Sequence, residues 1–191
     1  MADPDTTLRD RLVAVGVELV TSDGTGALTL RAIARRAGVS HGAPRRYFPT
    51  HLSLLSAIAR EGYLDLGRRL AGLGDDADPR AALLALGRRY LDFAHTQRGM
   101  FELMFRHELL RGNQIGLREA SRELFGVLVG LVGRARAGVP APPAVVVAGA
   151  LWANLHGIAQ LWQWGSLQMT VQTEDVDPLL RAALDAHLGP A

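Results

Sequence analysis

Apolar residues recur at helical spacing along nearly the whole chain, and this pattern constrains the fold more than any other feature of the sequence. Leu8, Leu12, Val15 and Leu19, for example, follow the i, i+4, i+7, i+11 spacing of one helical stripe. No segment shows the sustained alternation of a half-buried strand, and no internal repeat is present. The sequence therefore predicts an all-α fold.

Turn and capping residues divide this pattern into about nine helices. Thr29, Ser40 and Thr50 are predicted N-caps, and Gly38 is a predicted left-handed C-cap. Pro79 suits the first turn of a helix, where its missing N–H costs least. The predicted helices span residues 6–21, 29–38, 40–48, 50–72, 79–96, 100–110, 115–137, 144–165 and 176–188.

The basic residues, all 21 of which are arginine, are unevenly placed along the chain. The formal net charge is only +2, and the sequence pI of about 9.6 reflects guanidinium groups that stay charged to high pH. Five arginines and no acidic residue lie between Leu28 and His51, which leaves 16 arginines against 19 acidic residues, a net of −3, elsewhere. Such a concentrated positive segment indicates a phosphate-binding face, although charge alone also permits a solvated helix face.

Several classes of function are excluded by what the sequence lacks. Without cysteine there are no disulfides, thiolate metal sites, iron–sulfur clusters or cysteine nucleophiles. The sequence contains no glycine-rich phosphate loop, His-Glu-x-x-His motif or nucleophile elbow, and its six histidines show no metal-ligand spacing. We therefore expect no enzyme activity, no metal and no other cofactor.

No targeting or membrane-spanning segment is predicted. The first five residues are acidic and lack the apolar core of a signal peptide. The longest apolar run, Ala144–Ala153, is shorter than the ~20 residues that a transmembrane helix requires. We expect a cytoplasmic protein without membrane contact.

The two predicted helices on either side of Gly38 have the arrangement of a helix-turn-helix unit. In such units the second helix enters the major groove of DNA, while the first crosses the backbone. Arg31 lies in the first turn of the first helix, Arg45 and Arg46 lie on the second, and arginine can fork onto guanine. The alternative is a helical hairpin whose basic residues face solvent.

The stretch from Leu28 to Leu55 resembles the DNA-binding signature of the tetracycline-repressor (TetR) family. It carries Thr-x-x-x-Ile-Ala-x-x-Ala-Gly-Val-Ser from Thr29 to Ser40, followed by Tyr-Phe and a leucine-rich helix. With its flanking helices the resemblance spans roughly residues 6–72. It implies a helix-turn-helix DNA-binding domain at residues 1–50 and a ligand-binding and dimerisation domain at residues 51–191. The family's DNA contacts align with Thr29, Arg31, Ser40, His41, Gly42, Ala43, Arg45, Arg46, Tyr47 and His51.

Three positions depart from the usual pattern of the family. Arg45 stands where tyrosine is usual, His51 where lysine is usual, and Leu52 where glutamate is common. The first departure affects which base or phosphate the side chain at position 45 contacts. The second weakens a backbone contact, because histidine is a weaker cation than lysine at neutral pH.

The later stretch Leu151–Gly157 resembles a Trp…His-Gly motif in the C-terminal domains of one TetR subgroup. The resemblance implies a C-terminal domain that binds a small molecule and forms a homodimer through its last two helices. Aromatic and methionine side chains suit an adaptable apolar pocket, but the same spacing also suits a helical core. The candidate ligand-binding residues are Phe93, Met100, Phe101, Met104, Phe105, Trp152 and His156.

Small residues recur every four positions along the predicted helix that contains this motif. Gly149, Ala153 and Gly157 form a strip on which another helix can pack closely, either from the same chain or from a second copy. By the family resemblance we assign this strip to the dimer interface.

Together these features predict a ligand-responsive transcriptional regulator that binds DNA as a homodimer. We expect a repressor that a small apolar or amphipathic effector releases from a palindromic operator in double-stranded DNA, with the helix from Thr50 joining the two domains. The alternative is a non-enzymatic helical protein that binds apolar ligands and has no DNA function. The acid-free arginine cluster favours the regulator, because a ligand carrier has no need for it.

Overall fold

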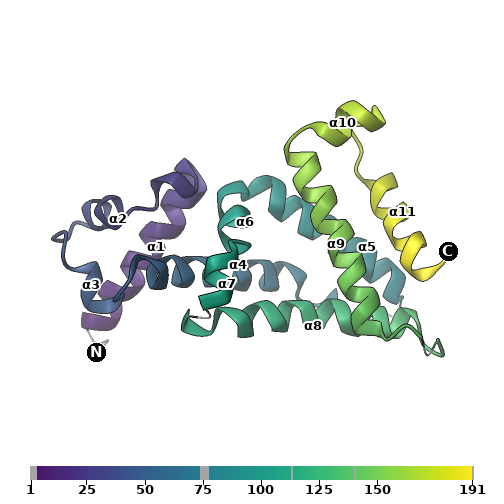
Figure 1. Ribbon diagram of the computed structural model, residues 1–191, viewed down its shortest axis with the longest axis horizontal. Helices are drawn as coiled ribbons and strands as arrows, with labels where there is room; N and C mark the ends of the chain where they lie inside the picture. The colour runs from purple at the N-terminus through teal and green to yellow at the C-terminus, as the bar shows by residue number, and fades with distance from the viewer. Residues whose placement is uncertain (1–3, 74–77, 113, 140, 191) are drawn as a thin grey trace. The chain divides into compact units, whose positions relative to one another are not determined.

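The computed structural model describes residues 4–73, 78–112, 114–139 and 141–190, and every regular element in these ranges is helical (Figure 1). The all-α prediction is confirmed for this part of the chain. The α-helices are α1 (Pro4–Asp23), α2 (Leu30–Arg36), α3 (Pro44–Tyr47), α4 (His51–Leu70), α5 (Pro79–Thr96), α6 (Arg98–Met104), α7 (His107–Gly112), α8 (Leu117–Ala135), α9 (Ala144–Gln163), α10 (Ser166–Val171) and α11 (Asp177–Leu188), and the short 3₁₀ helices are η1 (Thr25–Ala27) and η3 (Gln114–Gly116).

The described residues form eleven α-helices, so the predicted number of about nine is wrong. The single helix predicted over residues 100–110 is divided into α6 and α7, and at the break the Met104 carbonyl accepts a hydrogen bond from the Tyr63 hydroxyl (2.9 Å). The helix predicted over residues 144–165 stops at Gln163. Gly165 there adopts a left-handed conformation (φ +75°), and the chain restarts as α10.

Contacts between Cα atoms divide the chain into two compact units, neither of which is continuous in sequence. The first unit comprises Met1–Asp65 and Gln97–Ser121, and the second comprises Leu66–Thr96 and Arg122–Ala191. Helices α4 and α8 each contribute residues to both units. The functional boundary at residue 50 remains a prediction, since compactness does not measure function.

In the first unit, glycines let α1, α4 and α6 approach one another closely. A side chain at Gly16 of α1 would collide with Ile58 of α4. A side chain at Gly62 of α4 would lie 2.6 Å from the Met104 sulfur atom of α6. Both positions therefore favour glycine because of tight packing between helices.

An aromatic cluster completes the core of this unit. The Phe101 and Phe105 rings meet edge to face with centroids 4.9 Å apart, and Tyr63 contacts Phe105 in the same manner at 6.1 Å. Burial raises the pKa of Tyr63 to about 12, although a hydrogen bond with Ser121 opposes the shift. The Tyr63 hydroxyl is thus a neutral hydrogen-bond donor at physiological pH.

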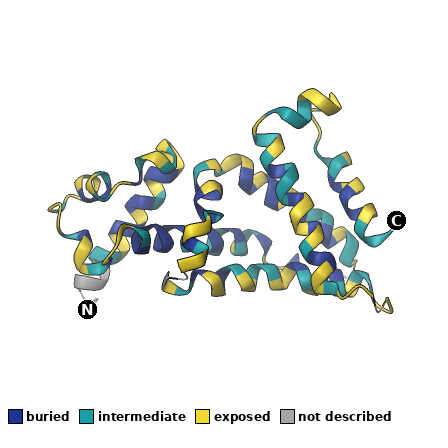
Figure 2. Ribbon diagram, viewed as in Figure 1, coloured by how far each residue is buried: buried dark blue, intermediate teal, exposed yellow. Residues whose placement is uncertain are grey.

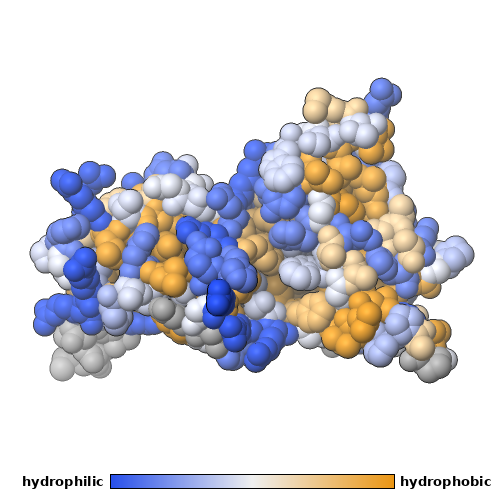
Figure 3. All heavy atoms as spheres, in the orientation of Figure 1, coloured by the Kyte–Doolittle hydropathy of each residue, from blue (hydrophilic) through white to orange (hydrophobic). Residues whose placement is uncertain are grey.

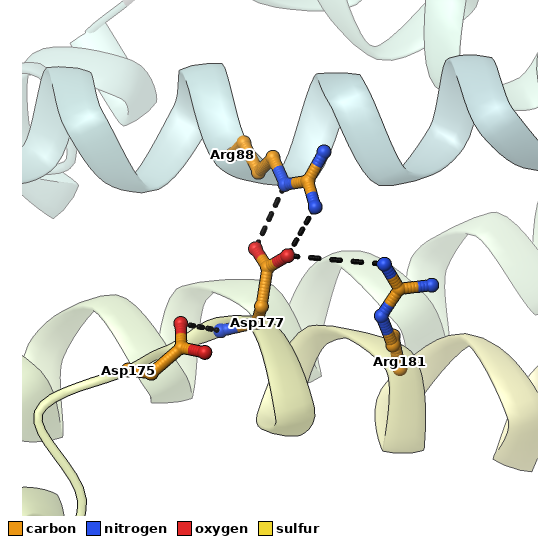
Figure 4. A network of polar contacts seen from close by, with 4 residues as sticks. All are labelled: Arg88, Asp175, Asp177 and Arg181. Atoms are coloured by element: carbon orange, nitrogen blue, oxygen red, sulfur yellow. Dashed lines mark hydrogen bonds and ion pairs between the residues drawn. The ribbon is translucent and has the colours of Figure 1, made fainter.

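In the second unit, α5, α9 and α11 pack against one another. At the crossing, a side chain on Gly87 of α5 would lie 3.1 Å from Leu180 of α11 and 3.5 Å from Leu155 of α9. An ion-pair network also joins α5 to α11 (Figure 4). Arg88 donates to Asp177 through Nε (2.7 Å) and through Nη2, and Arg181 lies 3.9 Å from the same carboxylate.

We expect Asp177→Asn to lower the melting temperature at neutral pH and to have less effect in acid. The hydrogen bond from Arg88 holds the pKa of Asp177 below its ordinary value of 3.8. A carboxyl group with a lowered folded-state pKa stabilises the fold above its unfolded-state pKa, and this contribution is lost as pH falls through the folded-state value. Thermal denaturation of both proteins between pH 7 and roughly pH 3 measures the difference. A gap in melting temperature that is constant across this range would contradict the expectation.

Helix α9 is the one helix in the described ranges that is long and apolar enough, by length and composition alone, to cross a membrane. Only 28% of the most apolar 18-residue stretch of this helix is buried. Its buried residues are Val147, Ala148, Leu151, Leu155 and Ala159, which form one stripe at helical spacing. Figure 2 shows the exposed and half-buried residues that occupy the rest of the helix. The helix packs as a core element on one face and leaves an apolar remainder exposed.

Candidate nucleic-acid interface and candidate ligand residues

Local capping interactions define the helix-turn-helix segment. The Thr29 hydroxyl oxygen accepts a hydrogen bond from the Ala32 N–H (3.1 Å), which confirms Thr29 as the N-cap of α2. Gly38 has φ +67°, and the Val39 N–H reaches back to the Ala34 carbonyl (3.0 Å). This is the Schellman arrangement that ends a helix, as the glycine predicts.

The helix after the turn is shorter than predicted, and Ser40 is not its N-cap. Residues 41–43 form turns, the regular helix α3 begins at Pro44, and its N-cap is Ala43 without a side-chain hydrogen bond. In a helix capped by Ser40, the residue at position 44 would donate its N–H to the Ser40 carbonyl. Proline has no N–H, so the first turn cannot close there. The Ser40 carbonyl instead accepts a hydrogen bond from the Ala43 N–H (3.0 Å).

The candidate DNA-binding residues reach the surface of the first unit. Ala43 and Tyr47 are half-buried, and the other eight are exposed. Pro44 and Phe48 are buried and anchor α3, with the Arg9 guanidinium of α1 stacked 5.4 Å from the centre of the Phe48 ring. Figure 3 shows hydrophilic side chains around α2 and α3.

In the fold, an acidic residue from α1 lies beside the acid-free arginine segment. Arg36 at the end of α2 forms an exposed ion pair with Glu18 of α1 (3.7 Å). The interaction lowers the local excess of positive charge, and sequence spacing gave no signal for it. Arg31, Arg35, Arg45 and Arg46 are also exposed.

His51 occupies the first turn of α4, beside a capping pair at the helix N-terminus. The Ser53 N–H donates to the Thr50 side-chain oxygen (3.0 Å) and the Thr50 N–H donates to the Ser53 hydroxyl (3.2 Å), so the predicted Thr50 cap is confirmed. The His51 Nε2 atom lies within hydrogen-bonding distance of the Leu28 carbonyl oxygen. The ring is therefore aimed at the segment that precedes α2.

The candidate ligand residues are distributed over both units. Met100, Phe101 and Met104 are buried in the core of the first unit, where Phe105 is half-buried. In the second unit Phe93 is fully buried, with the Arg69 guanidinium 5.2 Å from its ring centre, whereas Trp152 is 39% exposed and His156 is half-buried. Most of these residues are buried, as expected if they belong to the core. Their contact with a ligand remains a prediction.

A polar pair on the inner side of α9 joins this helix to α5. The Tyr90 hydroxyl lies 2.9 Å from Nδ1 of His156, whose ring centre is 5.9 Å from that of Trp152. Burial lowers the pKa of His156, which favours the neutral imidazole. Sequence reasoning did not pair Tyr90 with His156, because 66 residues separate them.

The small-residue strip on α9 faces open space. Ala153 is exposed, and a Cβ atom built on Gly149 or Gly157 would have no atom within 4 Å. No described part of the chain packs against these two glycines, so the intrachain alternative for the strip is not realised. Figure 3 shows apolar atoms on the surface of α8 and α9. Val127 of α8 and Val145 and Val146 of α9 are exposed.

Two surface cavities lie within the second unit, and neither contains a candidate ligand residue. One of about 280 Å³ is lined by the end of α4 and by α8, and one of about 320 Å³ lies between the start of α5 and the end of α11. Among the described residues, no group of histidine, aspartate and glutamate side chains could hold a metal ion.

Family models match both parts of the chain. Residues 12–58 match "Bacterial regulatory proteins, tetR family", and residues 83–187 match "Tetracyclin repressor-like, C-terminal domain". The chain belongs to the TetR family. It is therefore a DNA-binding transcriptional regulator that responds to a ligand, and not an enzyme.

Solved structures agree with this TetR assignment. A protein of unknown function from Rhodococcus sp. RHA1 is 32% identical, with a TM-score of 0.79 and 95% of this chain and 93% of that chain covered. The TetR transcriptional regulator SCO0520 from Streptomyces coelicolor is 26% identical, with a TM-score of 0.56 and coverage of 96% and 99%. RolR in complex with resorcinol shares the fold at 20% identity, with a TM-score of 0.68 and coverage of 97% and 89%. No protein with a curated description matches the chain.

Proposed function

We propose that this TetR-family protein is a homodimeric repressor that leaves a palindromic operator when a small apolar or amphipathic effector binds. The observation that carries the proposal is the exposed helix-turn-helix unit, whose two helices display Arg31, Arg45 and Arg46 on one acid-poor segment. Residues 1–50 are the DNA-binding domain, and residues 51–191 bind the effector and form the dimer.

The dimer is supported by the unpartnered face of α9. Its exposed valines and the small-residue strip combine apolar character with room for a close helix–helix approach. A two-fold dimer also presents two recognition helices to half-sites one helical turn of DNA, or a multiple of it, apart. A palindromic operator follows from that symmetry.

The effector is proposed to be a small molecule with apolar surface and a hydrogen-bonding group. The Tyr90–His156 pair, in which burial favours the neutral imidazole, supplies polar atoms beside the Trp152 ring. RolR, which has the same fold, binds resorcinol, a compound of this type. The effector acts only through a difference in affinity for two conformers, and a switch from 1:99 to 99:1 requires about 5.5 kcal/mol.

We expect Arg46→Ala to weaken binding to operator DNA by about 1–3 kcal/mol, if the Arg46 guanidinium forks onto guanine. The operator is obtained by selecting duplexes from a random-sequence library with the wild-type protein, and affinity is measured by fluorescence anisotropy on selected and random DNA. The loss falls on the selected duplex, because a base contact contributes to specific binding.

The matched control is Arg122→Ala, which removes the same charge from an exposed position on α8. It leaves DNA affinity near that of the wild type. Equal losses on selected and random DNA would make Arg46 a phosphate contact. A wild-type protein that enriches no sequence would contradict the proposed function itself.

A further inference from the structure

The His51 side chain joins the N-terminus of α4 to the segment that precedes α2. Helix α4 begins at His51, and the His51 Nε2 atom contacts the carbonyl oxygen of Leu28, which directly precedes the N-cap Thr29 of α2. The two positions are 23 residues apart in sequence. The imidazole thus bridges the chain at the points where both helices start.

The Leu28 carbonyl lies outside the hydrogen-bond pattern of α2. That pattern begins one residue later, where the Ile33 N–H donates to the Thr29 carbonyl (3.0 Å). The Leu28 side chain is buried, with 2% of its surface exposed, so the local backbone is held against the core. A carbonyl group in this position needs a donor from elsewhere in the structure, and the His51 ring supplies it.

The chemistry of this contact determines what His51 can offer to DNA. A carbonyl oxygen only accepts hydrogen bonds, so Nε2 must carry the hydrogen. In the neutral ring Nδ1 is then an acceptor, and it presents a lone pair rather than an N–H to an approaching phosphate. A His51 ring that donates to Leu28 through Nε2 therefore cannot offer that N–H to phosphate.

We propose that His51 is a positioning residue, which ties the start of α4 to the backbone before α2 and so fixes the helix-turn-helix unit on α4, instead of contacting phosphate itself. The placement of the helix-turn-helix unit decides whether its side chains can reach base edges and phosphates together. This inference rests on the proposed DNA-binding function, and it reassigns one of the candidate contact residues.

The salt dependence of DNA binding separates positioning from phosphate contact. Each cationic phosphate contact that is lost reduces the slope of log K against log[salt] by about 0.9. A residue that only positions other groups changes affinity without changing this slope. We therefore expect His51→Ala to lower affinity about five-fold, the effect of one hydrogen bond, with the slope of the wild type.

Two further variants of the full chain complete the test. His51→Gln should bind within about two-fold of the wild type, because the glutamine amide places an N–H donor the same number of bonds from Cβ. His51→Lys should steepen the slope by about 0.9, because it introduces a charged phosphate contact. The duplex is the one that the wild-type protein selects from a random-sequence library.

A reduced slope for His51→Ala would overturn the proposal, as would an affinity equal to that of the wild type or a failure of His51→Gln to restore binding. Amide hydrogen exchange in the free protein provides a readout that needs no DNA. There we expect the Ile33 amide to exchange faster in His51→Ala and at the wild-type rate in His51→Gln. If that exchange pattern holds while the wild-type protein selects no DNA, the contact is real and only the proposed function fails.

Discussion

Phe101→Ala is expected to destabilise the protein by about 3–5 kcal/mol, the cost of removing a fully buried aromatic side chain from a packed core. Phe101 has no exposed surface and meets Phe105 edge to face. Natural domains have unfolding free energies of about 5–15 kcal/mol, so this loss removes a large part of the total stability. Urea denaturation at one fixed protein concentration measures it, because the stability of a dimeric protein depends on concentration.

Phe105→Ala is the matched comparison, since both rings belong to one cluster but Phe105 is only half-buried. We expect a clearly smaller loss, because less apolar surface returns to water. A residue whose main role is to line an effector pocket would behave differently. Truncation would then weaken effector binding and leave the unfolding free energy nearly unchanged. That result for Phe101 would contradict its place in the core.

The features that the sequence predicted correctly are those that a few neighbouring residues determine. The caps at Thr29 and Thr50 and the left-handed Gly38 each depend on hydrogen bonds between residues at most five positions apart. The error at Ser40 is local as well. Pro44 stands four residues after Ser40, and its missing N–H was visible in the sequence as an obstacle to that cap.

The interactions that escaped prediction join residues far apart in the chain. Glu18 pairs with Arg36, His51 contacts Leu28, and Tyr90 contacts His156. Periodicity identifies which face of a helix is apolar but not which helix will cover it. Interhelical polar contacts of this kind therefore depend on tertiary packing, which one sequence does not supply.

Aromatic and methionine residues illustrate the same limit. A core and an apolar pocket both require large apolar side chains at helical spacing, so the pattern of Phe93, Phe101 and Met104 suits either. In the structure all three have no exposed surface. The small-residue strip on α9 shows a related limit, because glycine and alanine at every fourth position allow a close helix approach but do not say which helix makes it.

Gly99→Ala is expected to lower stability by about 1–3 kcal/mol, the usual cost of forcing extra atoms into a packed interface. Helix α6 lies against α1 at this point, and a Cβ atom on Gly99 would collide with the Val20 carbonyl oxygen and lie 3.1 Å from Cα of Gly24. Both obstacles are backbone atoms, which cannot rotate away as a side chain can. Relief therefore requires α6 to move away from α1.

This displacement should also reduce DNA affinity. Helix α1 packs against α2 and α3, and hydrogen bonds such as that from Thr25 to Glu102 (3.0 Å) tie α6 to the segment before α2. The family model of the C-terminal domain begins at residue 83 and includes α6, whereas α6 packs within the first unit. A change in α6 is therefore positioned to alter the helices that read DNA.

Gly67→Ala is the control, because it makes the same substitution in α4 where the new Cβ atom would have no neighbour within 4 Å. Alanine in an unobstructed helix position raises stability by about 0.5–1 kcal/mol relative to glycine. The two variants should therefore shift the urea midpoint in opposite directions, and only Gly99→Ala should weaken binding to the selected duplex. If Gly99→Ala were stabilising as well, α6 and α1 would have room between them, and α6 would not be fixed to the DNA-reading helices in the way that their packing implies.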